Sequence, residues 1–164
     1  MASGNTLVVF TPLHNEPPAS NYATLALRNE RPILVFDKST DQSAIFSAVL
    51  PRQYEGNGLT VLLVWASEDQ TTNDVVWTGA FERIEDDTTG LDSDNFASAK
   101  SVAATTASVA GETKYSEIAF ANGSEIANLA AGEAFRLKVT RDADHGSDLM
   151  DGNAQLLAVE VRET

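Results

Sequence analysis

Apolar residues follow one another almost without interruption in two stretches near the middle of the chain, residues 59–66 and 75–84. A strand that is exposed on one side alternates apolar and polar side chains, whereas a strand buried on both sides is apolar at nearly every position. The segment between the stretches, SEDQTTND, is too short for a helical crossover. We therefore expect two central strands that pair antiparallel with each other and carry apolar side chains on both faces.

Other stretches also show strand patterns. β-Branched and aromatic residues fill residues 6–11, and short apolar runs at 32–37 and 43–51 end at polar or proline-containing segments. Polar and apolar side chains alternate in residues 134–142 and 154–163, which is typical of strands with one buried face. The inward residues expected in these last two strands are Phe135, Leu137, Val139, Leu157, Val159 and Val161.

Two segments are less regular. Residues 11–32 contain four prolines and no sustained period, so we expect an irregular Pro-rich arm or loop with one short strand at 24–27. Residues 96–113 are rich in Ala, Ser and Thr, and they suit a flexible linker and a small-residue strand equally well.

The strand count defines the fold class. With a further strand at 114–120 we count eight or nine strands, and the helical signal is one short helix or turn from Ser124 to Gly132. Short strands separated by turn residues predict an all-β fold, an antiparallel β-sandwich. We predict a jelly roll of eight or nine strands with at most one short helix, because the Cys–Trp–Cys signature of an immunoglobulin domain is absent.

The composition of the chain excludes several classes of function. A length of 164 residues fits a single domain over residues 1–164, and the lack of cysteine excludes disulfides, a thiolate nucleophile and cysteine metal sites. The net charge of −13 would repel phosphate backbones, so we expect no nucleic-acid partner. We see no signal peptide and no apolar run long enough for a bilayer, so we expect synthesis in the cytosol and no membrane partner.

Four aspartates lie within ten residues of each other, Asp142, Asp144, Asp148 and Asp151, and they are candidate ligands for Ca²⁺. They do not match the spacing of an EF-hand, and aspartates in a long hairpin turn are more often simply solvated, so we predict no metal and no cofactor. The two histidines lie in loops with no nucleophile motif. We therefore predict no catalytic residues and no enzyme activity.

Uncovered apolar residues are the candidates for an interface. A single sandwich covers one face of the strands at 59–66 and 75–84, and the other face needs another cover. We expect that cover from further copies of the chain. The interface residues that we predict are Leu62, Val64, Val76 and Tyr54.

Aromatic residues could also form a binding surface. Trp65 and Trp77 lie within unbroken apolar strands, so we expect them in the core or in a subunit contact. The three tyrosines, Tyr22, Tyr54 and Tyr115, flank loops and are better candidates for an exposed platform.

Two long segments carry a resemblance. AIFSAVLPRQYEGNGLTVLLVWASEDQTTNDVVWTGAFERIEDD and GEAFRLKVTRDADHGSDLMDGNAQLLAVEVRET resemble small acidic proteins encoded among the virion genes of tailed bacteriophages. The resemblance covers most of the chain after Pro32 and contains no site motif. It implies a jelly-roll or sandwich module that assembles as a trimer and decorates or cements the capsid, or forms a knob, fibre tip or tail part.

These observations lead to three hypotheses. The first is a phage virion structural protein, a capsid decoration module (cement or knob) that stabilises the head surface as a homotrimer bound to the major capsid protein or other virion proteins. The alternative is a carbohydrate- or receptor-binding domain of a tail or fibre tip. The third, a polysaccharide-cleaving enzyme, is disfavoured by the missing catalytic motif.

Overall fold

The computed structural model describes residues 4–164, which form ten β-strands joined by loops. Within this part of the chain, helical structure is limited to two 3₁₀ turns, and no helix is long and apolar enough to cross a membrane. The strands are β1 (Thr6–Phe10), β2 (Thr24–Arg28), β3 (Arg31–Phe36), β4 (Gln42–Val49), β5 (Leu59–Ser67), β6 (Asp74–Ile84), β7 (Lys100–Thr105), β8 (Thr113–Phe120), β9 (Ala134–Arg141) and β10 (Ala154–Glu163). The turns are Pro12–His14 and Ser124–Ile126.

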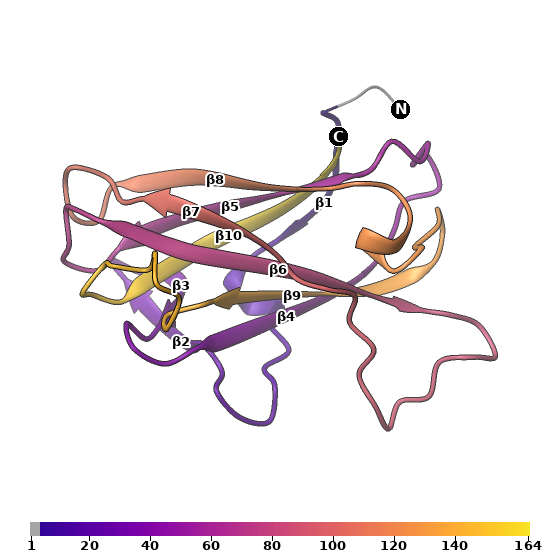
Figure 1. The fold of residues 1–164 in the computed structure, drawn as a ribbon, viewed down its shortest axis with the longest axis horizontal. Helices are drawn as coiled ribbons and strands as arrows, with labels where there is room; N and C mark the ends of the chain where they lie inside the picture. Colours follow the sequence, from indigo (N-terminus) through magenta and orange to yellow (C-terminus); the bar gives the residue numbers. More distant parts are fainter. Residues whose placement is uncertain (1–3) are drawn as a thin grey trace.

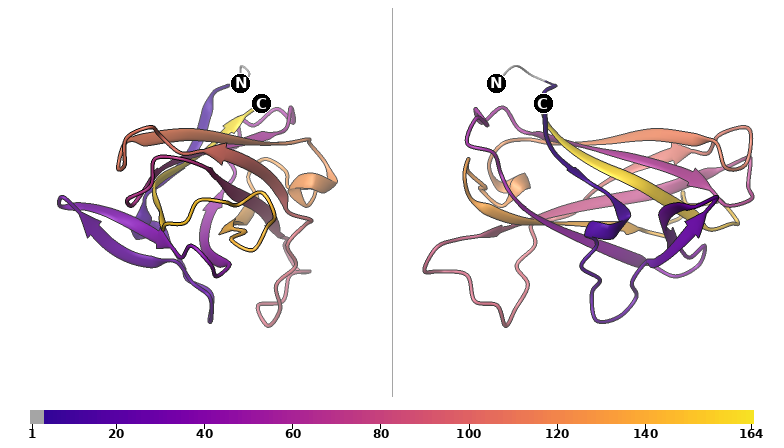
Figure 2. Two further views of the ribbon diagram at one scale, coloured as in Figure 1. Left: turned by 60° about the vertical axis from the view of Figure 1, so that its left-hand side comes forward. Right: turned by 180° about the vertical axis from the view of Figure 1, so that it is seen from behind.

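The strands form two antiparallel sheets that lie one over the other (Figures 1 and 2). The larger sheet has the order β2-β3-β10-β5-β8, with β1 also paired to β10, and the smaller sheet has the order β4-β9-β6-β7. From β3 onward, every connection except that from β6 to β7 passes from one sheet to the other. This is a jelly roll, so the predicted fold class is confirmed, although the described residues form ten strands where eight or nine were predicted.

Large aromatic side chains fill the space between the sheets. Trp65 and Trp77 are fully buried, with their ring centroids 5.8 Å apart, and Phe36 meets Trp77 edge-on at 5.0 Å. Phe81 and Phe120 make a second edge-on pair at 5.0 Å. Edge-to-face pairs of this kind stabilise a core beyond their buried area. Both tryptophans therefore belong to the core of one chain.

The predicted pairing of the two central strands is wrong. β5 pairs with β10 and β8, whereas β6 pairs with β9 and β7, so the two lie in opposite sheets. The loop that follows Ser67 crosses from one sheet to the other. Packed sheets are about 10 Å apart, a distance that a few extended residues span. A loop of this length is therefore compatible with a hairpin and with a crossing.

The outward apolar side chains of β5 and β6 are largely covered within one chain. Leu62 is 7% exposed and Val76 is 2% exposed. Arg162 on β10 and Glu117 on β8 form an ion pair that bridges over β5, and Glu117 lies directly opposite Leu62. Long charged side chains cover apolar surface with their aliphatic parts. The expectation that a second chain must cover Leu62 is therefore corrected.

Val76 is covered in another way. It lies under the loop that follows β9, where the N–H of Asp142 donates to the carbonyl of Val76, and the N–H of Val76 donates to the carboxylate of Asp148. Tyr54 is also buried, at 8% exposure, whereas Val64 is half-buried. Contrary to the sequence-based expectation, Val76 and Tyr54 are not free interface residues, because loops of the same chain pack over them.

The Pro-rich segment is bound to its own chain. Residues 11–23 run along the edge of β4, where the N–H of Glu16 donates to the carbonyl of Ile45 and the N–H of Ala23 donates to that of Ser43. The rest of the predicted arm, up to residue 32, forms β2 and the start of β3. Of the two interpretations left open for residues 96–113, the small-residue strand holds for β7.

Candidate functional site

A hollow of about 330 Å³ opens on the outward face of the larger sheet. On one side it is bounded by the hairpin that joins β2 to β3, and on the other by the ends of β5 and β8. Its floor lies on β10 and on the neighbouring residues of β3 and β5. We call this hollow the hairpin groove.

Arg28 forms one wall of the hairpin groove and reaches across it. Its Nη1 donates to the carbonyl of Ser67 at 3.0 Å and to Oε1 of Gln155 at 2.6 Å. Gly111 makes room for the guanidinium, since a Cβ there would lie 2.4 Å from Nη2 of Arg28. With its φ of +84°, Gly111 also adopts a backbone conformation that glycine accepts without strain.

The floor of the groove is apolar. Ile33 and Ala66 are both 3% exposed, and they point away from the core because their sequence neighbours point into it. Leu157 also lines the floor, although the sequence predicts it to be an inward residue. A register shift between Leu156 and Ala158 inserts an extra residue at this point of β10, which reverses the side to which Leu157 belongs.

An exposed aromatic ring stands next to the groove. Thr113 lines the groove, and Tyr115 is two residues further along β8, so both lie on the same face of the sheet. Tyr115 is 68% exposed. Its ring is therefore available as a platform, in agreement with the prediction.

The other two tyrosines are placed differently. The Tyr54 hydroxyl donates to Oδ1 of Asn122 and accepts a hydrogen bond from the N–H of Gly58, and burial raises the pKa of Tyr54. Tyr54 is therefore a structural residue and no platform. Tyr22 is half exposed and lies at a separate hollow formed by the segment before β2.

Cations without a carboxylate partner gather at the hairpin groove. Of the eleven lysines and arginines, six form salt bridges with described residues. Arg28 and Arg31 are among the five others, and both line the groove, whose lining includes no Asp or Glu. Arg28 and Arg31 also lie directly opposite each other in the β2–β3 ladder. The groove therefore has a local positive charge in a strongly acidic chain.

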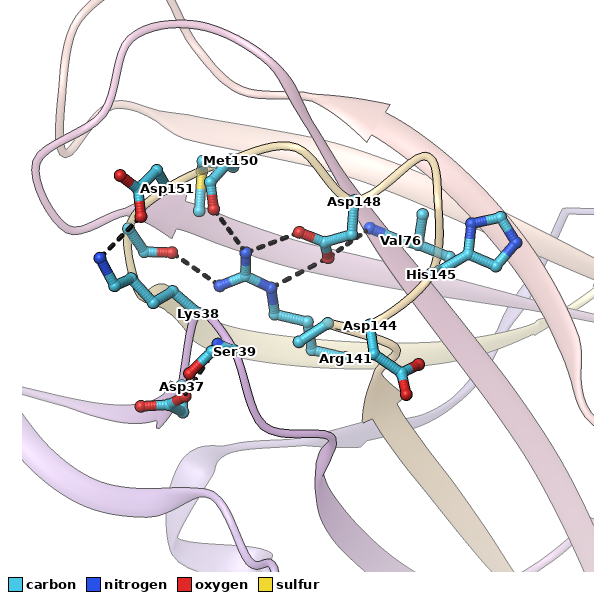
Figure 3. Close-up of polar contacts among 12 residues, drawn as sticks. Asp37, Lys38, Ser39, Val76, Arg141, Asp144, His145, Asp148, Met150 and Asp151 are labelled. Carbon is cyan, nitrogen blue, oxygen red and sulfur yellow. Dashed lines mark hydrogen bonds and ion pairs between the residues drawn. The ribbon is translucent and has the colours of Figure 1, made fainter.

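Two of the four aspartates in the acidic loop after β9 pair with cations of the same chain. Arg141 is fully buried, and its guanidinium donates to both carboxylate oxygens of Asp148 and to the carbonyls of Met150 and Gly152 (Figure 3). Asp151 pairs with Lys38 at the surface, 2.6 Å apart. These two candidate calcium ligands are therefore occupied by cations of the chain.

The remaining two candidates lie together. Asp142 and Asp144 place carboxylate oxygens within 4.8 Å of each other and of Asp41, a residue that the sequence pattern does not single out. Burial raises the pKa of Asp142, and the neighbouring carboxylates of Asp144 and Asp41 raise it further. Asp41 also accepts backbone hydrogen bonds from Ala143 and Asp144, which explains its position without an ion. The four predicted ligands therefore do not form one site.

The two histidines take part in local turns. Nδ1 of His14 accepts a hydrogen bond from the N–H of Thr11, and Nδ1 of His145 accepts one from the N–H of Ser147. In the described residues neither histidine is bonded to a carboxylate.

Comparisons with solved structures find β-sandwich modules. The xylan-binding module CBM15 is 10% identical, with a TM-score of 0.51 and 96% of this chain and 97% of that chain covered. The CBM22-2 xylan-binding domain of Xyn10C from Paenibacillus barcinonensis is 15% identical, with a TM-score of 0.47 and 92% of each chain covered. The family 11 carbohydrate-binding module from Clostridium thermocellum is 12% identical, with a TM-score of 0.47, 99% of this chain and 87% of that chain covered.

At these identities the similarity shows the fold alone. The match to CBM15 over nearly the whole of both chains supports the β-sandwich assignment. No protein-family model matches the sequence, and no curated protein matches it significantly.

Proposed function

We propose that the chain is a carbohydrate-binding domain that holds a sugar chain in the hairpin groove and against Tyr115, without catalysing a reaction. The observation that carries this proposal is the groove itself, an apolar floor with a few fixed polar groups above it. Ligand sites in proteins combine apolar walls with a small number of placed hydrogen-bonding groups. Sugar rings match this combination, since they present apolar C–H faces and hydroxyl edges.

The fold gives secondary support. A module of the same fold, CBM15, is described as xylan-binding, so the architecture is compatible with sugar binding. The low identity transfers no residue and no substrate. The polar groups that would contact hydroxyls are those of this chain, Asn29, Thr113, Gln155 and the two groove arginines.

A glycan array followed by calorimetry tests the proposal. We expect the wild-type chain to bind at least one class of glycan, and Tyr115→Ala to weaken that binding roughly two- to tenfold, because a stacked aromatic ring contributes about 0.5–1.5 kcal/mol beyond its buried area. Tyr22→Ala removes an exposed tyrosine elsewhere and should leave affinity unchanged. No binding to any glycan, or equal losses in the two variants, would reject the proposal.

The virion role stays a prediction from the resemblance. The physical support for it is the expectation that one apolar face of the central strands needs a second chain to cover it. Most of that face is covered within one chain. A homotrimeric decoration protein would be present in purified particles and would sediment as a trimer at micromolar concentration. A stable monomer that is missing from particles would remove this candidate, whereas a particle-bound chain that binds glycans would fit a tail or fibre tip.

A further inference from the structure

We infer that the hairpin groove selects a sugar chain that carries carboxylate groups, such as a uronic or sialic acid, through Arg28 and Arg31. This inference rests on the proposed carbohydrate binding and adds the class of sugar. Three features of the groove support it: its unneutralised charge, the donors left free on Arg28, and the position of Arg31.

The charge of the groove is unusual for this molecule. The chain has 24 acidic and 11 basic residues, so most basic side chains have an acidic residue within reach. The two groove arginines form no salt bridge with any described residue, and neither Asp nor Glu lines the hollow. By contrast, the polar hollow near β6 is lined by Arg83 together with Glu85, which pair with each other.

The guanidinium of Arg28 is held in place by neutral groups only. Nη1 donates to Ser67 and Gln155, whereas Nε and Nη2 donate to no described residue. Planar guanidinium groups bind carboxylates through two parallel hydrogen bonds, and a guanidinium that is already fixed loses less entropy on binding. Arg28 is thus a fixed cation with unused donors that points into a groove.

Arg31 adds a second positive charge at a cost in stability. Like charges directly opposite each other in an antiparallel pair are destabilising, and Arg28 and Arg31 are such a pair. Arg31 is exposed and bonded to no described side chain. An anion bound between the two guanidinium groups would remove this repulsion, so the free domain is arranged to gain from binding one.

The acidic surface restricts where such a ligand can bind. The net charge of −13 repels polyanions at long range, and only a site with concentrated positive charge overcomes this at contact distance. We therefore expect a carboxylated glycan to bind at the groove and nowhere else on the chain.

The test compares glycans that differ in charge alone. Oligogalacturonide, oligoalginate and sialyllactose are titrated into the full chain, each as the free acid and as its methyl ester, which keeps the sugar and removes the charge. We expect at least one acid to bind at least about tenfold more tightly than its ester, as charge-assisted hydrogen bonds imply. The variants Arg28→Gln and Arg31→Gln should each remove most of this preference.

Arg52→Gln is the matched control, because Arg52 forms no salt bridge with a described residue and lies against Gly132, outside the groove. It should keep the preference for the acid. Equal binding of acids and esters, or an equal loss in Arg52→Gln, would overturn the inference while carbohydrate binding stands. Binding of neutral glycans on the array with none of the acids would do the same. If no glycan of any kind binds, the proposed function itself fails.

Discussion

Arg141 shows how a single buried charge fixes a loop. Both partners of the Arg141–Asp148 pair have side chains that are 0–1% exposed, and Asp148 also accepts the N–H of Val76. Arg141→Met leaves the Asp148 carboxylate buried without its cation. Removing one partner of a buried pair costs about 3–5 kcal/mol, so we expect a loss of that size in the free energy of unfolding, measured by urea denaturation.

The exposed pair that Asp151 of the same loop forms with Lys38 of the β3–β4 loop provides the control. Lys38 and Asp151 keep 50% and 82% of their side chains exposed, and solvent screening leaves exposed pairs of this kind with little net effect on stability. Lys38→Met should therefore change stability little. A comparable loss in both variants would contradict the structural role given to burial.

Asp142 gives a dependence of stability on pH with a defined sign. Burial raises its pKa in the folded state above the ordinary value of an aspartate, so the folded state binds its proton more tightly than the unfolded state. This contribution to stability is present at low pH and is lost as the pH rises through the raised pKa. Asp142→Asn should therefore raise the melting temperature at neutral pH, with a gain that disappears in acid.

Asp151 should show the opposite sign, since its ion pair with Lys38 lowers the pKa of Asp151. Asp151→Asn is expected to lower the melting temperature slightly at neutral pH and not in acid. Calorimetric melting over an acid-to-neutral series measures both effects. The same direction of change in the two variants would argue against the assignment.

Sequence alone predicts side-chain orientation where a strand is regular. Phe135, Leu137 and Val139 are buried as the alternation of β9 predicts. Leu157 fails because a bulge reverses the alternation within β10, and bulges follow from pairing with two neighbouring strands rather than from local composition.

At the scale of elements, the β2–β3 turn carries local strain. Asn29 and Glu30 both have positive φ, +46° and +65°, as a two-residue type I′ hairpin requires. Asparagine adopts this conformation several times more often than most residues, whereas glutamate adopts it at a steric cost. Glu30→Gly removes a steric cost of roughly 1–2 kcal/mol but adds about 0.4–1 kcal/mol of unfolded-chain entropy. We therefore expect a net gain in stability of up to about 1 kcal/mol by urea denaturation, and a smaller gain for Asn29→Gly. An unchanged or lower free energy of unfolding for Glu30→Gly would show that the turn adopts another conformation.

Strands are easier to predict than their partners. Periodicity predicts the two central strands, but it does not show which sheet each strand joins. That depends on which strands from distant parts of the sequence pair with its two edges. The hairpin groove could not be predicted from the sequence for the same reason. Its residues come from four segments between residues 28 and 157, and only the register of β3, β10, β5 and β8 brings them together. Tyr115 was found because an aromatic residue beside a loop is a local signal.

At the scale of the molecule, charge repulsion is the dominant feature. The net charge of −13 destabilises a compact state through repulsion between like charges. Raising NaCl from about 0.01 M to about 0.15 M shortens the screening length from about 30 Å to about 8 Å, so we expect the melting temperature to rise. Choline chloride should act equally if screening is the cause. A melting temperature that falls with either salt would indicate that surface ion pairs outweigh the repulsion.

The central position of β10 has a consequence for how the chain is made. β10 lies between β3 and β5 and also pairs with β1, so the larger sheet joins strands that are synthesised early to the strand that follows the other nine in the sequence. During synthesis, the larger sheet lacks its central strand until β10 has left the ribosome. The two sheets can therefore pack completely only after residue 163 has emerged. Such long-range pairing is typical of domains that fold in milliseconds to seconds. Deletion of β10 would thus leave an open, aggregation-prone sandwich instead of a shortened domain.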